Sequence, residues 1–214
     1  MSSRPEASAP RRTHFYRPAE GHRLRHNPFN AIVAPRPIGW ISSLSAQGVP
    51  NVAPYSFFNA FNYTPPIVGF ASTGEKDSVR NVAATGEFTW NLVTRPQAEA
   101  MNATSATVAA GVDEFTLAGL GREPSVEVAP ARVAGAPVSF ECVLTQLVRL
   151  SGRDGTPLEA WLALGEVVAV HIDEHLVASG VYDTTAARPV VRGGGPTTYY
   201  EITEDRRFDL VRPA

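Results

Sequence analysis

Alternation of apolar and polar residues dominates this chain, and a period of two is typical of β-strands. It is clearest at the start of segment 138–150, where residues 138, 140, 142 and 144 are apolar, and in the Val-rich run 161–172. Shorter apolar runs, punctuated by Gly and Pro, extend the same pattern. The predicted strands are 37–44, 66–72, 87–94, 138–150 and 161–172.

Helical patterns are fewer and shorter. Segment 78–84 predicts one or two turns, and segment 96–106 has a proline at a first-turn position followed by apolar residues at near-helical spacing. Closely spaced strands with two small inserted helices predict a mainly β protein with a closed or partly closed barrel. The glycines of 193–195 lack the spacing and the strand and helix context of a dinucleotide fingerprint, so we do not expect a Rossmann site.

Length and composition predict one globular domain after a polar arm. The chain has 214 residues, of which 43% are hydrophobic and 19% charged, enough to bury a sizeable core. Residues 1–25 are rich in arginine and proline and are predicted to be a poorly ordered arm, with the domain spanning 26–214. An organelle transit peptide is the alternative for the arm, against which Glu6, Glu20 and the prolines argue.

Charge and cysteine content exclude several classes of protein. The net charge is -2, so no basic face for nucleic acid is expected. A single cysteine, Cys142, allows no internal disulfide and favours a reducing compartment. We find neither an apolar run of membrane-span length nor the apolar core of a signal peptide, which predicts no membrane partner and a cytoplasmic location.

The only lysine of the chain, Lys76, lies in a turn that runs into the predicted helix 78–84. With Asp77 or Ser78 as the expected N-cap, free backbone N–H groups, the positive end of the helix dipole, Lys76 and nearby Arg80 would gather at one place. Such a place suits a phosphate group. The alternative is an ordinary surface lysine beside a helix cap.

Several blocks of sequence closely resemble the flavin reductase-like proteins, which are FMN-binding split β-barrels related to the flavin components of two-component monooxygenases. The blocks are RPIGWISS at 36–43, GVPNVAPYSFFN at 48–59, PPIV at 65–68, KDSVRN at 76–81 and EF at 87–88, in matching order and spacing. A looser resemblance continues through 165–168 and 192–200. The resemblance implies a Greek-key split barrel of six or seven strands that forms a homodimer, with the partner completing the flavin pocket.

FMN needs a phosphate cradle, polar partners for its ring edge and a flat apolar wall. The predicted cradle combines Lys76 with Asp77, Ser78 and Arg80, and Trp40 is the candidate wall. The resemblance implies that segment 51–59 forms a strand along the ring. The other predicted binding residues are Ser42, Ser43, Ala53, Ser56, Phe57 and Asn59. Single aromatic residues here can equally be barrel core, the serines can be satisfied strand hydroxyls, and Asn59 can be a turn residue.

The function implied by the resemblance is hydride transfer from NADH or NADPH to FMN, with a monooxygenase as a possible partner. The flavin carries the chemistry, so no catalytic side chain is assigned. One alternative is a flavoprotein that holds FMN tightly for another redox reaction, and another is a non-catalytic flavin carrier. In the homodimer, Arg192, Tyr199 and Tyr200 are the candidates for reaching the partner's pocket, and the glycines of 193–195 are either a flap or a plain surface loop.

No metal site is expected. His171 and His175 are four residues apart, but a strand end and a turn separate them, so they would not share a helical face. His171 could instead point into the flavin pocket. Cys142 lies in an apolar strand, where a buried thiol is inert.

Overall fold

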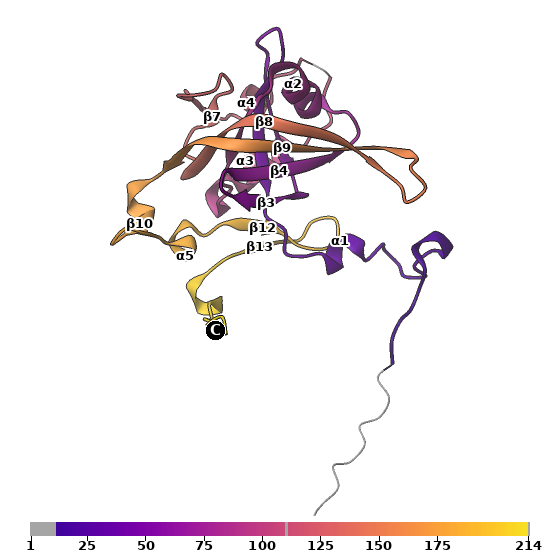
Figure 1. Ribbon diagram of the computed structural model, residues 1–214. Helices are drawn as coiled ribbons and strands as arrows, with labels where there is room; N and C mark the ends of the chain where they lie inside the picture. Colours follow the sequence, from indigo (N-terminus) through magenta and orange to yellow (C-terminus); the bar gives the residue numbers. More distant parts are fainter. Residues whose placement is uncertain (1–11, 110, 214) are drawn as a thin grey trace, which may run out of the picture.

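The computed structural model describes residues 12–109 and 111–213, and its centre is one seven-stranded antiparallel sheet (Figure 1). The strand order is β2-β1-β5-β8-β9-β4-β3. The strands are β1 Gly39–Leu44, β2 Pro50–Tyr55, β3 Phe58–Tyr63, β4 Pro66–Thr73, β5 Glu87–Asn91, β8 Val138–Ser151 and β9 Pro157–Ile172. This confirms the predicted mainly β fold, and the seven strands form a split barrel.

The sheet curls so that its two end strands, β2 and β3, come together at a sharp corner in the chain. The corner consists of Ser56 and Phe57, between the end of β2 and the start of β3. The start of β1 also touches β3, because a Cβ on Gly39 would lie 2.8 Å from the Phe58 ring. No ladder joins β2 to β3 in the described part of the chain, which leaves the barrel split at this seam.

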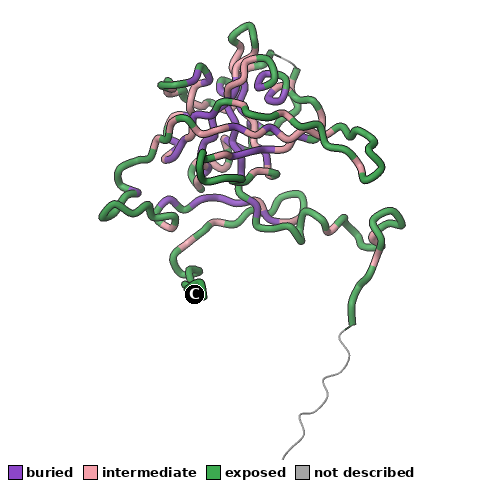
Figure 2. The backbone as a smooth tube through the Cα atoms, viewed as in Figure 1, coloured by how far each residue is buried: buried purple, intermediate pink, exposed green. Residues whose placement is uncertain are grey.

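The barrel interior holds the main hydrophobic core, drawn in purple in Figure 2. Ile41, Phe70 and Phe88 are fully enclosed there. Helix α2, Asp77–Thr85, buries Val79 and Val82 in the same core. It ends at Gly86, whose φ of 75° is the left-handed conformation that glycine adopts at low cost. The helix therefore packs against the barrel with its first turn anchored beside the end of β4.

A second core lies between the outer face of the sheet and a layer of short elements. Trp40 and Val52 pack there against Met101 of α3 (Ala98–Ala103) and Phe115 of α4 (Glu114–Leu117). The side strands β6 Arg122–Glu123 and β7 Arg132–Val133 border this layer.

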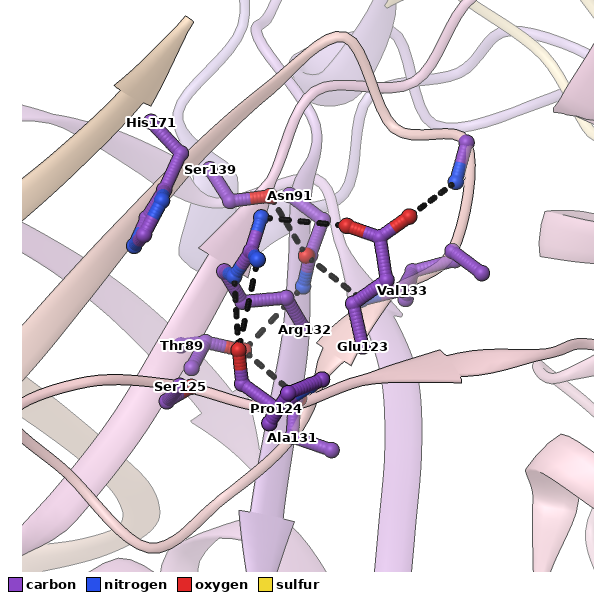
Figure 3. A network of polar contacts seen from close by, with 12 residues as sticks. Thr89, Asn91, Glu123, Pro124, Ser125, Ala131, Arg132, Val133, Ser139 and His171 are labelled. Carbon is purple, nitrogen blue, oxygen red and sulfur yellow. Dashed lines mark hydrogen bonds and ion pairs between the residues drawn. The ribbon is translucent and has the colours of Figure 1, made fainter.

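Asn91 ties the loop that carries β6 and β7 to the sheet. Its Oδ1 accepts hydrogen bonds from the Ser139 hydroxyl and the Val133 amide, both at 2.9 Å (Figure 3). Its Nδ2 donates to the Trp40 carbonyl. Since all four residues are buried, the network fixes the outer layer rather than offering a binding surface.

The C-terminal part of the chain forms a small hairpin beside the N-terminal segment, below the barrel in Figure 1. The hairpin pairs β12 Val190–Arg192 with β13 Tyr199–Glu201, and an isolated bridge joins Arg36 to Arg192. The remaining elements are η1 Pro18–Glu20, α1 Phe29–Ile32, η2 Arg95–Gln97, η3 Glu174–Leu176, β10 Val177–Ala178, β11 Val181–Tyr182, α5 Thr184–Ala187 and η4 Glu204–Arg206.

The predicted strands and the first helix match the structure to within a few residues, with two corrections. The strand predicted over 51–59 is two strands, because the chain turns the barrel corner at Ser56 and Phe57. The helix predicted over 96–106 starts as the 3-10 turn η2 and ends at Ala103. For the predicted arm, residues 1–11 lie outside the described part, and most residues of 12–25 are exposed. The domain boundary at 25/26 stays a prediction.

Candidate functional site

The start of helix α2 presents free hydrogen-bond donors. Its N-cap is Lys76, in extended conformation, and no side chain caps the helix. The amides of Asp77, Ser78 and Val79 therefore lack the intrahelical partners that later residues have. The expected N-cap at Asp77 or Ser78 is a prediction that the structure corrects by one or two residues. The expected gathering of amide donors and a lysine at this place is nevertheless present.

A cavity of about 370 Å³ opens at this helix start. It lies between β2, the turn before α2 and the segment that leads from α3 to α4. Its lining residues are Asn51, Ala53, Pro54, Tyr55, Glu75, Lys76, Asp77, Ser78, Arg80, Thr104, Ser105, Ala106, Thr107, Val108 and Glu114. Five of the predicted binding residues are thus brought together in one cavity: Ala53, Lys76, Asp77, Ser78 and Arg80.

The two cations that line the cavity, Lys76 and Arg80, differ in whether they are free to pair with a bound anion. Arg80 forms an ion pair with Asp77 and also donates to the Glu75 carbonyl. Lys76 is exposed and has no ion-pair partner among the described residues. Lys76 is therefore the cation that can meet a bound anion, whereas Arg80 neutralises the carboxylate at the helix start.

A buried polar network fixes the helix start to the barrel. The Ser78 hydroxyl donates to Asn51 Oδ1 at 2.7 Å, and the Ser43 hydroxyl donates to the same oxygen at 3.2 Å. Asn81 Nδ2 donates to Ser43 Oγ at 3.2 Å. Since all four side chains are buried, the hydroxyls of Ser43 and Ser78 position α2 instead of facing solvent. Ser78 can still offer its backbone amide.

Tyr55 lines the cavity and carries a buried, unpaired hydroxyl. The side chain is 6% exposed, its ring lies 4.7 Å from that of Phe70, and its hydroxyl has no hydrogen-bond partner among the described residues. The nearby hydroxyls of Ser72 and Ser78 donate elsewhere, to the Gly74 carbonyl and to Asn51. Burial raises the pKa of Tyr55, so the phenol is a neutral donor. Such an orphaned donor suits an anionic ligand.

Glu114 is a nearly buried carboxyl group on the opposite wall. It is 4% exposed, and its Oε2 accepts the Val52 amide at 3.3 Å. Burial raises the pKa of Glu114, partly offset by hydrogen bonds from the backbone and from the Asn51 amide.

Three of the predicted binding residues, Trp40, Ser42 and Ser43 on β1, do not line this cavity. Trp40 is 0% exposed within the outer core, and its indole N–H donates to the Thr104 hydroxyl at 3.1 Å. It therefore presents no face to a ligand ring. Ser42 is buried as well, and neither Ser42 nor Ser43 lines the cavity, because α2, α3 and α4 cover β1 on both faces.

The remaining predicted residues lie at the barrel corner, outside this cavity. Arg36 Nε donates to the Ser56 carbonyl at 3.1 Å, and its guanidinium carbon lies 5.9 Å from the centre of the Phe57 ring. Asn59 is exposed, and its Oδ1 accepts from the following amide. Ser56, Phe57 and Asn59 remain predicted ligand residues. The same Arg36 reaches the Gly193 carbonyl at 3.3 Å, so the Gly193 loop adjoins this corner.

The other candidate groups, His171, His175 and Cys142, form neither a metal site nor a nucleophilic site in the described part of the chain. His171 Nε2 lies 2.6 Å from Glu141 Oε1, and His171 is not among the residues that line the Lys76 cavity (Figure 3 shows His171 beside the loop of β6 and β7). His175 Nδ1 lies 4.0 Å from Asp173 Oδ2. The described residues contain no group of three or more potential metal ligands. Burial raises the pKa of the Cys142 thiol far above neutrality, which keeps it inert.

Sequence reasoning missed three contributors to the cavity: Tyr55, Glu114 and segment 104–108. Tyr55 lies inside the block 48–59, but only the structure shows that its hydroxyl is unpaired. Glu114 and segment 104–108 come from a part of the chain without a recognisable short motif, and only the tertiary fold places them opposite Lys76.

Comparison with known proteins gives a consistent picture. The family model described as "Flavin reductase like domain" matches residues 33–190. Nitrilotriacetate monooxygenase component B from Bacillus cereus is 30% identical with a TM-score of 0.78, over 87% of this chain and 98% of that one. The Pseudomonas fluorescens 2-nitrobenzoate 2-nitroreductase NbaA is 28% identical with a TM-score of 0.81, over 94% and 96%.

A third solved structure supports the fold alone. It is a candidate flavin reductase with a split barrel domain from Shewanella frigidimarina, 22% identical with a TM-score of 0.76, over 86% of this chain and 90% of that one. Within the described residues, no helix is long and apolar enough to span a membrane.

Proposed function

The chain belongs to the flavin reductase-like family, and on that premise we propose that it binds FMN through the cavity at Lys76 and reduces it with NADH or NADPH. Family membership supports flavin binding. The narrower statements, FMN as the flavin and a nicotinamide dinucleotide as the reductant, are our proposal.

The observation that carries the proposal is the donor set at the start of α2. Free amides of the first helical turn and the Lys76 ammonium, which has no ion-pair partner among the described residues, meet at one small cavity that Tyr55, with its unpaired hydroxyl, also lines. A phosphate monoester accepts hydrogen bonds through several oxygens and carries negative charge, so it fits this set. The residues present therefore fit the phosphate end of FMN. The sequence carries no dinucleotide fingerprint that would hold an adenosine half, which favours FMN over FAD.

The chain's own residues supply binding and orientation. Lys76 and the amides of Asp77 and Ser78 hold the phosphate, while the network of Asn51, Ser43 and Asn81 keeps α2 in place. The corner at Ser56 and Phe57 would present backbone groups to the ring, and Arg36 fixes that corner through its bond to the Ser56 carbonyl. When bound, the flavin ring supplies the hydride-accepting chemistry, so no acid or base from the protein is required.

We also propose that the working unit is a homodimer. Strand β3 is the end strand of the sheet and is largely exposed, with Phe61 at 53% and Tyr63 at 96%. An exposed apolar edge strand is a surface that a second subunit can cover. Such a partner would lie against the corner at Ser56 and Phe57, with Arg192, Tyr199 and Tyr200 as the candidate residues reaching across. The likeness to a monooxygenase component B supports an oxygenase as the consumer of reduced flavin.

Steady-state oxidation of NADH and NADPH with excess free FMN tests the reductase. Turnover of many flavin equivalents per protein supports it. The absence of oxidation with either nucleotide would remove the reductase assignment, whatever the flavin affinity.

A second candidate function is reduction of an organic substrate by tightly held FMN. It is favoured by the likeness to a 2-nitrobenzoate 2-nitroreductase, which aligns over 94% of this chain. This candidate predicts that the protein retains FMN through gel filtration and oxidises the nucleotide only when a nitroaromatic acceptor is added under anaerobic conditions. A yellow protein inert to nucleotides and acceptors would instead be a flavin carrier.

A further inference from the structure

Two nearly buried carboxyl groups in the described residues have opposite surroundings. Glu141 accepts hydrogen bonds from the amides of Val126, Glu127 and Val128 and lies 2.6 Å from His171 Nε2. These donors outweigh its burial and lower the pKa of Glu141. Glu114 accepts from the Val52 amide at 3.3 Å, with its own amide and the Asn51 side chain as further donors, but these donors do not outweigh its burial, and the pKa of Glu114 is raised. A charge on Glu114 is therefore poorly compensated by the protein.

Glu114 shares the Lys76 cavity. Both residues line the same space of about 370 Å³, so a phosphate held beside Lys76 would share a small, partly buried cavity with the carboxyl group, where two negative charges repel. The side chain is connected to the helix start as well, since Asn51 lies beside Glu114 and accepts the Ser78 hydrogen bond.

The charged groups around Glu114 do not neutralise it. From α2, the Asp77 carboxylate is paired with Arg80, and Asp77 adds to the rise in the Glu114 pKa. On the same segment as Glu114, Asp113 is paired with Arg122.

Two more titratable groups, Glu75 and Tyr55, line the same cavity as Glu114. Glu75 is exposed at the turn before α2, and Tyr55 on β2 is neutral. Lys76 is the remaining cation among the lining residues, and a phosphate dianion carries more charge than one lysine can balance.

We propose that Glu114 sets the charge state in which the cavity accepts its ligand: the phosphate group binds with Glu114 protonated, so that binding takes up a proton. This inference rests on the proposed function, because the ligand is the phosphate of FMN. The sign follows from linkage. A group that binds its proton more tightly in the complex makes binding weaken as the pH rises, by up to about tenfold per pH unit, between its free and bound titrations.

The test compares FMN affinity across the range from about pH 5.5 to about pH 9, by fluorescence titration of the wild type and of Glu114→Gln. Glutamine keeps the shape and an acceptor for the Val52 amide but cannot ionise. The ratio of the wild-type dissociation constant to that of Glu114→Gln should rise with pH, to about tenfold or more at the alkaline end. Ionisation of the phosphate occurs with both proteins, so Glu114→Gln provides the reference for its effect on affinity.

Two controls isolate the effect. Glu127→Gln removes a charge from an exposed residue outside the cavity and should give a ratio near one throughout. With riboflavin, which lacks the phosphate, the ratio of the wild-type dissociation constant to that of Glu114→Gln should not rise with pH.

Tight FMN binding with a ratio that does not change with pH would overturn the inference while leaving the proposed function intact. No FMN binding by the wild type at any pH would overturn both. If Glu114→Gln fails to fold, calorimetric titration of the wild type near pH 8 in two buffers of different ionisation enthalpy decides the question. Proton uptake supports the inference, and its absence overturns it.

Discussion

The Ser78 hydroxyl donates a 2.7 Å hydrogen bond to Asn51 Oδ1, and this contact joins the first turn of α2 to strand β2. Because the same oxygen also accepts the Ser43 hydroxyl, one amide side chain orients both the helix and the neighbouring strand β1. The amides and the lysine at the helix start can serve as a phosphate cradle only if this turn is held in place. The network is thus the structural basis of the site.

Replacing Lys76 with alanine should weaken FMN binding by about ten- to a hundredfold, because a charge-assisted contact to phosphate is lost, worth about 1.5–3 kcal/mol. The melting temperature of the apo protein should barely change, since an exposed lysine without an ion pair contributes little to stability. Flavin fluorescence titration measures the affinity. Arg153→Ala, at the exposed turn between β8 and β9, is the control and should bind FMN normally.

Replacing Asn51 with alanine should lower both stability and affinity. The hydroxyls of Ser43 and Ser78 would be left buried without an acceptor, at a cost of about 1–3 kcal/mol in the free energy of unfolding. The start of α2 would lose its anchor, so FMN affinity should fall even though the Asn51 side chain is not proposed to touch the ligand. Urea denaturation of the apo protein and FMN titration check the two effects. A variant as stable as the wild type would show that the network is dispensable.

Tyr55→Phe should weaken FMN binding without lowering the stability of the apo protein. Removing a buried hydroxyl that has no partner should leave the apo protein as stable as the wild type or more stable by about 1 kcal/mol. FMN affinity should fall severalfold, because the orphaned donor no longer serves the ligand. Thermal unfolding with and without FMN measures both quantities. If FMN binds the variant as tightly as the wild type, Tyr55 is not a ligand residue.

The Glu141 carboxylate should make stability depend on pH in the acid range. Its pKa is lowered in the folded state by three amide donors and His171, against the opposing effect of burial. A carboxyl group with a lowered folded pKa contributes stability above its unfolded value, and that contribution is lost as the pH falls through the folded value. The stability difference between wild type and Glu141→Gln should be large at neutral pH.

The same difference should shrink once the pH drops below about 4.3, the ordinary value for a glutamate. Denaturant unfolding at several pH values measures it. Glu127→Gln, at an exposed side chain of the neighbouring loop, should show no comparable trend. A difference between wild type and Glu141→Gln that stays constant with pH would rule out the carboxylate as its cause.

The barrel strands could be predicted because alternation is a local property: the strand predicted over 138–150 matches β8 to within one residue, and the one predicted over 161–172 ends where β9 ends. Lys76 and its helix could be predicted for the same reason, since turn and helix signals lie within a few residues of each other. The N-cap prediction failed because Asn51, a residue far away in the sequence, takes the Ser78 hydroxyl.

The roles of Trp40 and Glu114 could not be predicted locally. An aromatic residue in a strand can face a ligand or a core, and only the packing of α3 and α4 over β1 decides that Trp40 is enclosed. Glu114 reaches the cavity because the chain between α3 and α4 folds back over β2, and no spacing in the sequence reports that path.

The central claim is that this chain is an FMN reductase whose cavity at Lys76 recognises the phosphate. The most direct test is the rate of NADH and NADPH oxidation with FMN and with riboflavin as alternative acceptors, for the wild type and Lys76→Ala. We predict that the wild type turns over with FMN at a much lower KM than with riboflavin, and that Lys76→Ala loses this preference by raising the KM for FMN alone. No oxidation of either nucleotide with FMN, or an undiminished preference for FMN in Lys76→Ala, would contradict the claim.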